Sequence, residues 1–235
     1  MWGWGCGYVR HVNRRQQEAR QAFLRVFPGG FEDEHYLAWE RDYKVEAATQ
    51  WRRLIGGKES MRATLDAGNH HAIAAAAVRI ESTRPLLFSF EKMALRDAVV
   101  RSAEGARSFS EGLYDWLHGR GSEGARFERW AATVSELPRP GTRVATWPVV
   151  TVFGPMAKPR RHLFVKPLTT KRAAAAYGYD LTYRSKPGWE TYRSVLDFAR
   201  TVRDDVADLG PRDLIDIQSF IWVLGSDEYA EARAA

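Results

Sequence analysis

Apolar residues recur at steps of three and four positions through most of this 235-residue chain, and that spacing constrains the fold more than any other feature. Such a period places apolar side chains on one face of an α-helix. Asn13 can cap the first predicted helix, and Gly68-Asn69 divides the third into two pieces. A further helix is expected after Pro85, and the others are expected at about 13–26, 33–55, 59–81, 108–118, 122–137, 169–177, 189–209 and 212–224.

One stretch departs from this helical period. Residues 144–153 read Val-Ala-Thr-Trp-Pro-Val-Val-Thr-Val-Phe, and β-branched and aromatic residues of this density favour a strand. Residues 162–165, His-Leu-Phe-Val, are expected to pair with it as a short second strand. The predicted fold class is therefore mainly α with α+β character, in which a helical lobe is joined to a small β-hairpin and C-terminal helices.

The proline-rich break at 138–141 is the one candidate boundary inside the chain. Residues 1–12 are predicted to form a flexible tail, because their aromatics and glycines follow no regular period. Residues 13–235 are predicted to form a single domain with a helical lobe at 13–137 and an α+β lobe at 142–235. One domain is favoured because the residues after the break lack an obvious core of their own.

Cysteine usage and hydropathy restrict where such a chain works. Cys6 is the only cysteine, so no internal disulfide can form, which is typical of a reducing compartment. The longest apolar runs, 72–78 and 220–224, are far shorter than the ~20 residues that a bilayer span requires. His70 and His71 are adjacent rather than four apart, which disfavours a metal pair on a helix. We therefore expect a cytoplasmic protein with no membrane association and no structural metal, and no motif identifies a cofactor.

Positive charge is concentrated between residues 156 and 193. The whole chain has a net charge of +6, and this segment holds nine cations against two acids. Arginine and lysine at this density suit phosphate groups, and flat aromatic rings between them can stack on bases. The predicted nucleic-acid-binding residues are Lys158, Arg160, Arg161, Lys166, Lys171, Arg172, Tyr177, Tyr179, Tyr183, Arg184 and Lys186.

This charge pattern favours a nucleic-acid-binding protein, such as a DNA defence or repair factor. Three other interpretations stay open: a smaller phosphorylated ligand, a basic face that binds an acidic protein, and a merely solvated surface. The pattern does not distinguish DNA from RNA or indicate the oligomeric state.

An enzyme acting on a nucleotide or a nucleic-acid base is the alternative. Lys166 follows the second expected strand among other cations, which would lower its pKa and suit a nucleophile or a phosphate clamp. His162 lies four residues earlier, on the same face of a strand, and Asp213 would complete the site. Asp213 and Asp216 also share a helix face and could hold a divalent ion, although capping explains Asp213 without a function and is the favoured interpretation.

The C-terminal part of the chain resembles parts of known proteins. Residues 189–222, from Trp189-Glu-Thr-Tyr192 through Leu209-Gly-Pro-Arg-Asp-Leu-Ile-Asp-Ile-Gln-Ser-Phe-Ile-Trp222, resemble tails of uncharacterised bacterial proteins and of proteins from modification-dependent restriction systems. The resemblance implies a DNA-related role and transfers no catalytic residue. No GTPase motif occurs, so the motor subunit of such a system is excluded.

Overall fold

Helices make up the regular structure of residues 13–83, 86–138 and 144–234, the ranges that this computed structural model describes. Within those ranges no strand occurs, so the mainly α prediction is confirmed and the predicted β-hairpin is wrong. The predicted tail at 1–12 lies outside the described residues. No described helix is both long enough and apolar enough to cross a bilayer.

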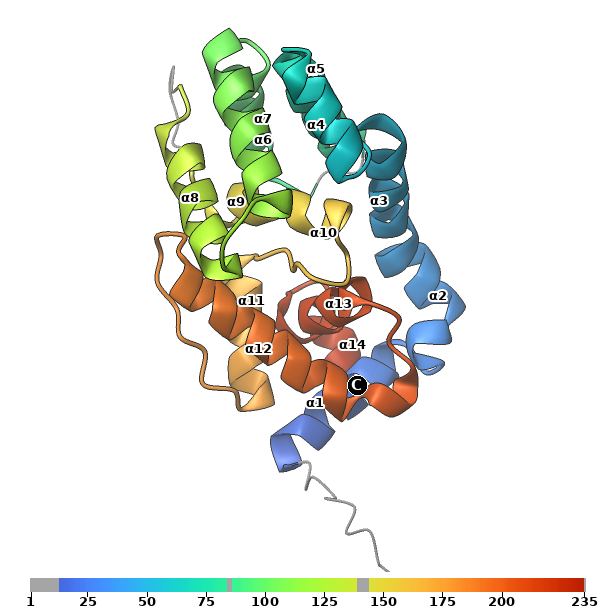
Figure 1. The fold of residues 1–235 in the computed structure, drawn as a ribbon. Coiled ribbons are helices and arrows are strands. Elements are labelled where there is room, and N and C mark those ends of the chain that lie inside the picture. The colour runs from blue at the N-terminus through green and yellow to red at the C-terminus, as the bar shows by residue number, and fades with distance from the viewer. Residues whose placement is uncertain (1–12, 84–85, 139–143, 235) are drawn as a thin grey trace, which may run out of the picture.

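The helices follow the predicted order closely (Figure 1). Asn13 caps the first with a side chain that accepts the Gln16 N–H at 3.0 Å, as expected. Their bounds are α1 Arg14–Val26, α2 Glu34–Tyr36, α3 Asp42–Leu54, α4 Lys58–Asp66, α5 His70–Thr83, α6 Ser89–Val99, α7 Ala103–His118, α8 Glu123–Glu136, α9 Trp147–Thr151, α10 Phe153–Ala157, α11 Pro167–Tyr177, α12 Trp189–Asp205, α13 Leu214–Gly225 and α14 Ala230–Ala234. Short 3₁₀ turns occur at Gly30–Glu32 and Ala207–Leu209.

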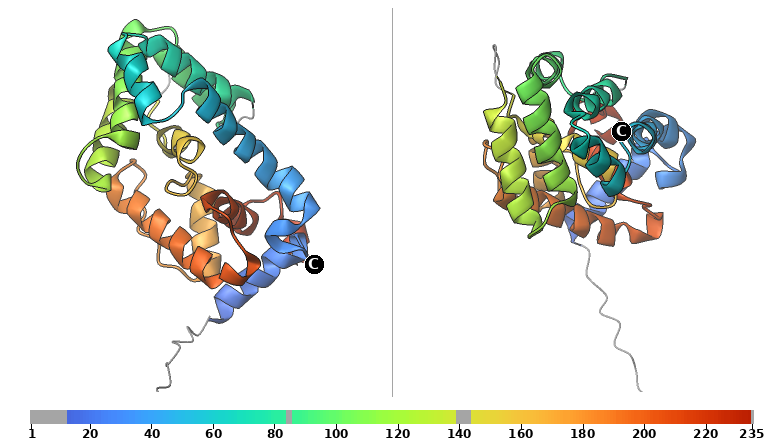
Figure 2. Two further views of the ribbon diagram at one scale, coloured as in Figure 1. Left: turned by 45° about the vertical axis from the view of Figure 1, so that its right-hand side comes forward. Right: turned by 45° about the horizontal axis from the view of Figure 1, so that its top comes forward.

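The longer helices surround the centre of the molecule. In the left view of Figure 2, α3, α5, α7, α8 and α12 form a frame, and α9, α10 and α13 lie inside it. Nearly every residue of α13 is buried, as expected of a helix that is apolar on all sides. At the C-terminal end of α13, Gly225 packs so close to α11 that a Cβ there would lie 2.0 Å from the Thr169 carbonyl oxygen. Buried side chains from Ala19 to Tyr229 form one continuous core.

The expected first strand folds instead as the buried helices α9 and α10. Pro148 has no N–H for a strand ladder and suits the first turn of a helix, which the Thr146 side chain caps by accepting the Val149 N–H. The run is apolar because α9 is buried on all sides. It therefore lacks the alternation of apolar and polar residues that indicates a half-buried strand.

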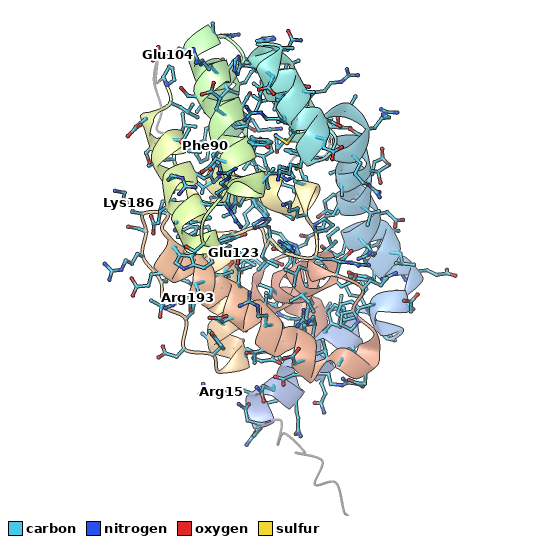
Figure 3. The ribbon with its side chains drawn as sticks, viewed as in Figure 1. Arg15, Phe90, Glu104, Glu123, Lys186 and Arg193 are labelled. Carbon is cyan, nitrogen blue, oxygen red and sulfur yellow. The ribbon has the colours of Figure 1, made fainter. Side chains whose placement is uncertain are left out.

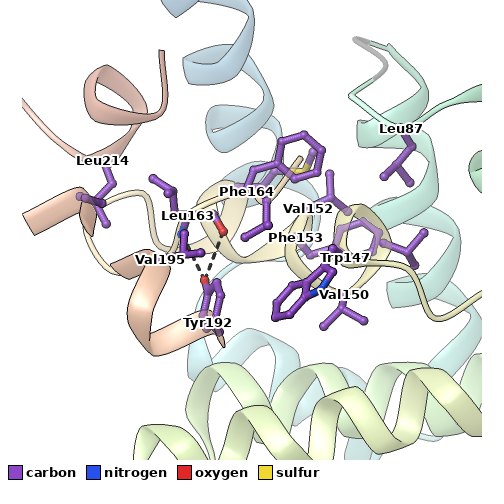
Figure 4. Packing of buried hydrophobic residues seen from close by; sticks show 14 of the residues in the cluster. Leu87, Trp147, Val150, Val152, Phe153, Leu163, Phe164, Tyr192, Val195 and Leu214 are labelled. Carbon is purple, nitrogen blue, oxygen red and sulfur yellow. Dashed lines mark hydrogen bonds between the residues drawn. The ribbon is translucent and has the colours of Figure 1, made fainter. Parts of the chain in front are cut away.

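The expected second strand is an extended segment without a partner strand. His162, Leu163, Phe164 and Val165 cross the middle of the molecule and are all buried. Side-chain hydroxyls take the place of a ladder: the Leu163 N–H donates to the Tyr192 hydroxyl at 3.1 Å (Figure 4), and the Val165 N–H donates to Thr151 Oγ1 at 2.9 Å. Buried backbone groups are thereby satisfied without a sheet.

A π turn at Leu37–Arg41 joins α2 to α3. The Asp42 N–H donates to the Leu37 carbonyl, five residues back, where an α-helix would use four. The extra residue turns Glu40 into the protein, where it is 3% exposed, and leaves Trp39 58% exposed at the surface. π turns are rare in proteins, and many of those that are known lie at functional sites.

Candidate functional site

Five arginines line one surface depression of about 260 Å³, which we call the arginine basin. Leu196 and Leu214 add apolar surface, and Glu123 is the one acidic residue among the described residues that line it. The arginines are Arg126, Arg160, Arg161, Arg200 and Arg203. Guanidinium groups gathered in this way favour phosphate, which each can bind through two parallel hydrogen bonds.

Four segments bring these arginines together. Arg126 lies near the start of α8, and its guanidinium donates to the carbonyls of Trp116, Gly119 and Gly121, which hold it in place. Arg200 and Arg203 are three residues apart on α12, so they share a helix face. Leu214 begins α13, and its N–H donates to the Pro159 carbonyl at 3.0 Å, which ties the turn carrying Arg160 and Arg161 to that helix.

The basin arginines differ in how far their charge is already neutralised. Arg200 pairs with Asp197 at 2.6 Å, and Arg203 lies 3.4 Å from a carboxylate oxygen of Asp204. The exposed guanidinium groups of Arg160 and Arg161 form no ion pair with any residue that the structure describes. These two are therefore the cations most available to a ligand.

The positive charge extends from the basin toward α4. Burial and the nearby cations Lys158, Lys58 and Arg126 lower the pKa of His118 to about 4. Behind the basin, burial and the cations Lys158, Arg126 and Arg161 lower the pKa of His162 to about 3. Both histidines are therefore neutral at pH 7, and neither adds positive charge to the cations near it.

The other predicted cations lie elsewhere. Lys171 and Arg172 are exposed on α11, where Lys171 Nζ lies 4.8 Å from the centre of the Tyr183 ring and Arg172 pairs with Asp227. Arg184 pairs with Glu190, and Lys186 projects at the edge of the molecule, apart from Glu123 of the basin (Figure 3). Of the predicted binding residues, Arg160 and Arg161 line the basin.

The predicted stacking tyrosines are largely packed against the protein. Tyr177 is 1% exposed, and its hydroxyl donates to Asp205 at 2.8 Å. Tyr179 packs on Phe198 with ring centres 5.0 Å apart, and Tyr183 packs on Trp147. Both are half-buried, so a base could reach only part of each ring.

The three predicted catalytic residues do not line a common cavity. His162 is buried with its ring 4.8 Å from that of Trp116, and its Nδ1 lies 3.3 Å from the Tyr192 hydroxyl. Asp213 caps α13 by accepting the Ile215 N–H at 2.9 Å, and it also pairs with Arg41. Of the three, Lys166 lines a cavity, on the other side of the extended segment from Leu163 and Val165.

That cavity, which we call the aromatic cavity, has a volume of about 210 Å³. Its polar side chains are Glu40, Lys44, Lys166, Gln218 and Glu228, and its rings come from Trp39, Tyr43, Phe164 and Trp222. Burial lowers the pKa of Lys166, and the carboxylates of Glu91 and Glu81 partly offset this effect. Lys166 could be selected from the sequence, whereas Lys44 and Gln218 could not, because only folding brings α3 and α13 beside Lys166.

No group of three histidine, cysteine, aspartate or glutamate side chains within the described ranges is arranged to hold a metal ion. Asp216, half of the carboxylate pair, instead accepts hydrogen bonds from Tyr36, Arg41 and Arg212. Comparisons of the chain with protein-family models, with curated proteins and with solved structures found no match. The resemblance of residues 189–222 to restriction-system tails therefore stays a prediction.

Proposed function

We propose that this chain binds a nucleic acid by gripping its phosphate groups in the arginine basin. The observation that carries the proposal is the convergence of five arginines on one depression, three of them without an ion-pair partner among the described residues. Phosphate contacts of this kind supply most of the affinity of sequence-independent nucleic-acid binding.

A polyanion fits the charge distribution better than a single phosphate does. Lys58, Lys158 and Arg126 all act on His118, and Lys158, Arg126 and Arg161 all act on His162. Lys58 and Lys158 lie outside the lining of the basin, so their positive charge adds to that of the arginines and favours a ligand with several phosphates. The proposal rests on backbone contacts rather than on base stacking, because Tyr177 is buried.

Fluorescence anisotropy with labelled 20-nucleotide single-stranded DNA, double-stranded DNA and RNA, measured over a salt series, tests this proposal. Arg160→Ala combined with Arg161→Ala removes two exposed side chains, so the fold is preserved. We expect affinity to fall at least about tenfold and the salt dependence, the slope of log K against log salt, to become shallower by roughly 1.5.

The matched control is Lys171→Ala combined with Arg172→Ala, which changes the net charge equally but lies outside the basin. We expect this variant to keep most of its affinity. Equal losses in the two variants would mean that net charge alone drives binding. Tight binding of pyrophosphate with no binding of oligonucleotide would identify a small phosphorylated ligand instead. The nucleic-acid proposal fails if the protein raises the anisotropy of none of the labelled oligonucleotides.

A further inference from the structure

The aromatic cavity is separate from the arginine basin and shares no lining residue with it. We infer that it binds a small, single-ring aromatic molecule carrying one anionic group, with that group beside Lys166. This inference is independent of nucleic-acid binding and rests on the size, the lining and the polar groups of the cavity.

The volume and lining set the size and shape of the ligand. An apolar cavity of about 150 Å³ is sufficient for a benzene molecule, so about 210 Å³ accepts one ring with a small substituent. Trp39 and Trp222 supply flat faces, and the 58% exposure of Trp39 places it at the opening of the cavity. Aromatic rings favour stacked or edge-to-face contacts with another ring.

The charged groups set the sign of the ligand. Lys44 is already neutralised, since its ammonium donates to Glu40 at 2.8 Å and to Ser219 at 2.9 Å. Glu40 is neutralised in turn by Lys44 and by the Tyr229 hydroxyl, which donates at 2.7 Å. Glu228, the remaining acid of the lining, is exposed and accepts the Trp222 Nε1–H at 3.0 Å. Lys166 is less exposed and forms no ion pair with a described residue, and its ammonium lies 3.9 Å from the centre of the Phe88 ring.

Two further observations point to a ligand at this position. Gln218 is 8% exposed and lines the cavity, yet its Oε1 has no hydrogen-bond partner among the described residues. A buried acceptor without a partner is costly, and a hydrogen-bond donor on the ligand, such as a hydroxyl group beside its anionic group, would satisfy it. The π turn places Glu40 and Trp39 at the same cavity, and that local geometry is often retained for function.

Three probes that share one ring but differ in charge test the inference: benzoate, benzyl alcohol and benzylamine, titrated by calorimetry. We expect benzoate to bind most tightly. Lys166→Met should lower the affinity for benzoate about tenfold, because the charged contact is lost, and should leave the affinity for benzyl alcohol unchanged, because the apolar contacts stay. Lys171→Met, the same change on an exposed side chain of α11, should change neither of these two affinities.

A second variant keeps the test decisive if Lys166→Met does not fold, as judged by circular dichroism. Ala47→Phe places a ring in the cavity from α3 and should abolish binding of all three probes, whereas Lys166→Arg should retain benzoate. The inference is overturned if no probe binds, if benzylamine binds more tightly than benzoate, or if Ala47→Phe leaves benzoate binding intact.

Discussion

Arg41 Nη1 donates to Asp216 Oδ1 at 2.7 Å, which joins the π turn to the buried first turn of α13. Asp216 has no exposed surface, and its second oxygen accepts the backbone N–H of Arg212 at 2.7 Å. The Tyr36 hydroxyl also donates to this carboxylate. One buried negative charge thus holds together two segments that are distant in the sequence, residues 36–41 and residues 212–216. The π turn keeps its place beside the aromatic cavity through this contact.

Asp216→Asn should destabilise the fold by about 3 kcal/mol, because the Arg41 and Arg212 guanidinium groups would lose a buried counter-charge. Urea unfolding followed by circular dichroism measures the change. Asp204→Asn is the control: it removes an exposed carboxylate 3.4 Å from Arg203 and should cost less than about 1 kcal/mol. Equal unfolding midpoints for both variants would contradict a structural role for Asp216.

Thr151→Val should destabilise the protein by about 1–2 kcal/mol, because the buried N–H of Val165 would lose its acceptor. Valine has nearly the shape of threonine, so the loss reports the hydrogen bond rather than packing. Thr151→Ser keeps the hydroxyl and should retain more of the stability than Thr151→Val does. Thermal unfolding compares the two variants. A serine variant less stable than the valine variant would show that the methyl group of Thr151 contributes more to stability than its hydroxyl group does.

The helices could be predicted from the sequence because their apolar period and their caps agree. Asn13 and the Gly68-Asn69 break are local signals, and the structure follows them. The hairpin prediction was wrong because residues 144–153 are apolar except for two threonines, and burial on all sides removes the period that separates helix from strand. Pro148 was the local signal that favoured a helix start.

The candidate sites were less accessible to sequence reasoning. Arg160 and Arg161 were selected from local charge, but Arg126 and Arg200 come from helices far along the chain. The sequence of a helix shows which charged residues share a face of that helix, but it does not show which other helix packs beside that face. Tyr177 was expected to stack on a base, yet it is buried, because an aromatic ring suits a core as well as a binding surface.

Gly225→Ala should destabilise the protein by about 1–3 kcal/mol, because the new methyl group would collide with the Thr169 carbonyl and push α11 from α13. Gly57→Ala is the control, since a Cβ there meets nothing within 4 Å. Chemical denaturation of both variants provides the comparison. Unchanged stability in Gly225→Ala would mean that the two helices separate at little cost.

The stability of the protein should fall as the pH is lowered from 7 to 5, and His162 should contribute to that fall. Its folded-state pKa of about 3 lies below the ordinary value of 6.5, so at pH 5 the unfolded chain binds a proton that the folded protein does not. The unfolded state is thereby favoured by about 2 kcal/mol at pH 5 relative to pH 7.

His162→Gln removes the titrating group, so the variant should lose about 2 kcal/mol less than the wild type over the same interval. Urea unfolding of both proteins at pH 7 and pH 5 measures the two differences, and subtracting the pH 7 values removes any cost of repacking against Trp116. The remaining titrating groups, His118 among them, are common to both proteins and cancel. Identical losses in the two proteins would mean that His162 is protonated as readily in the folded state as in the unfolded chain.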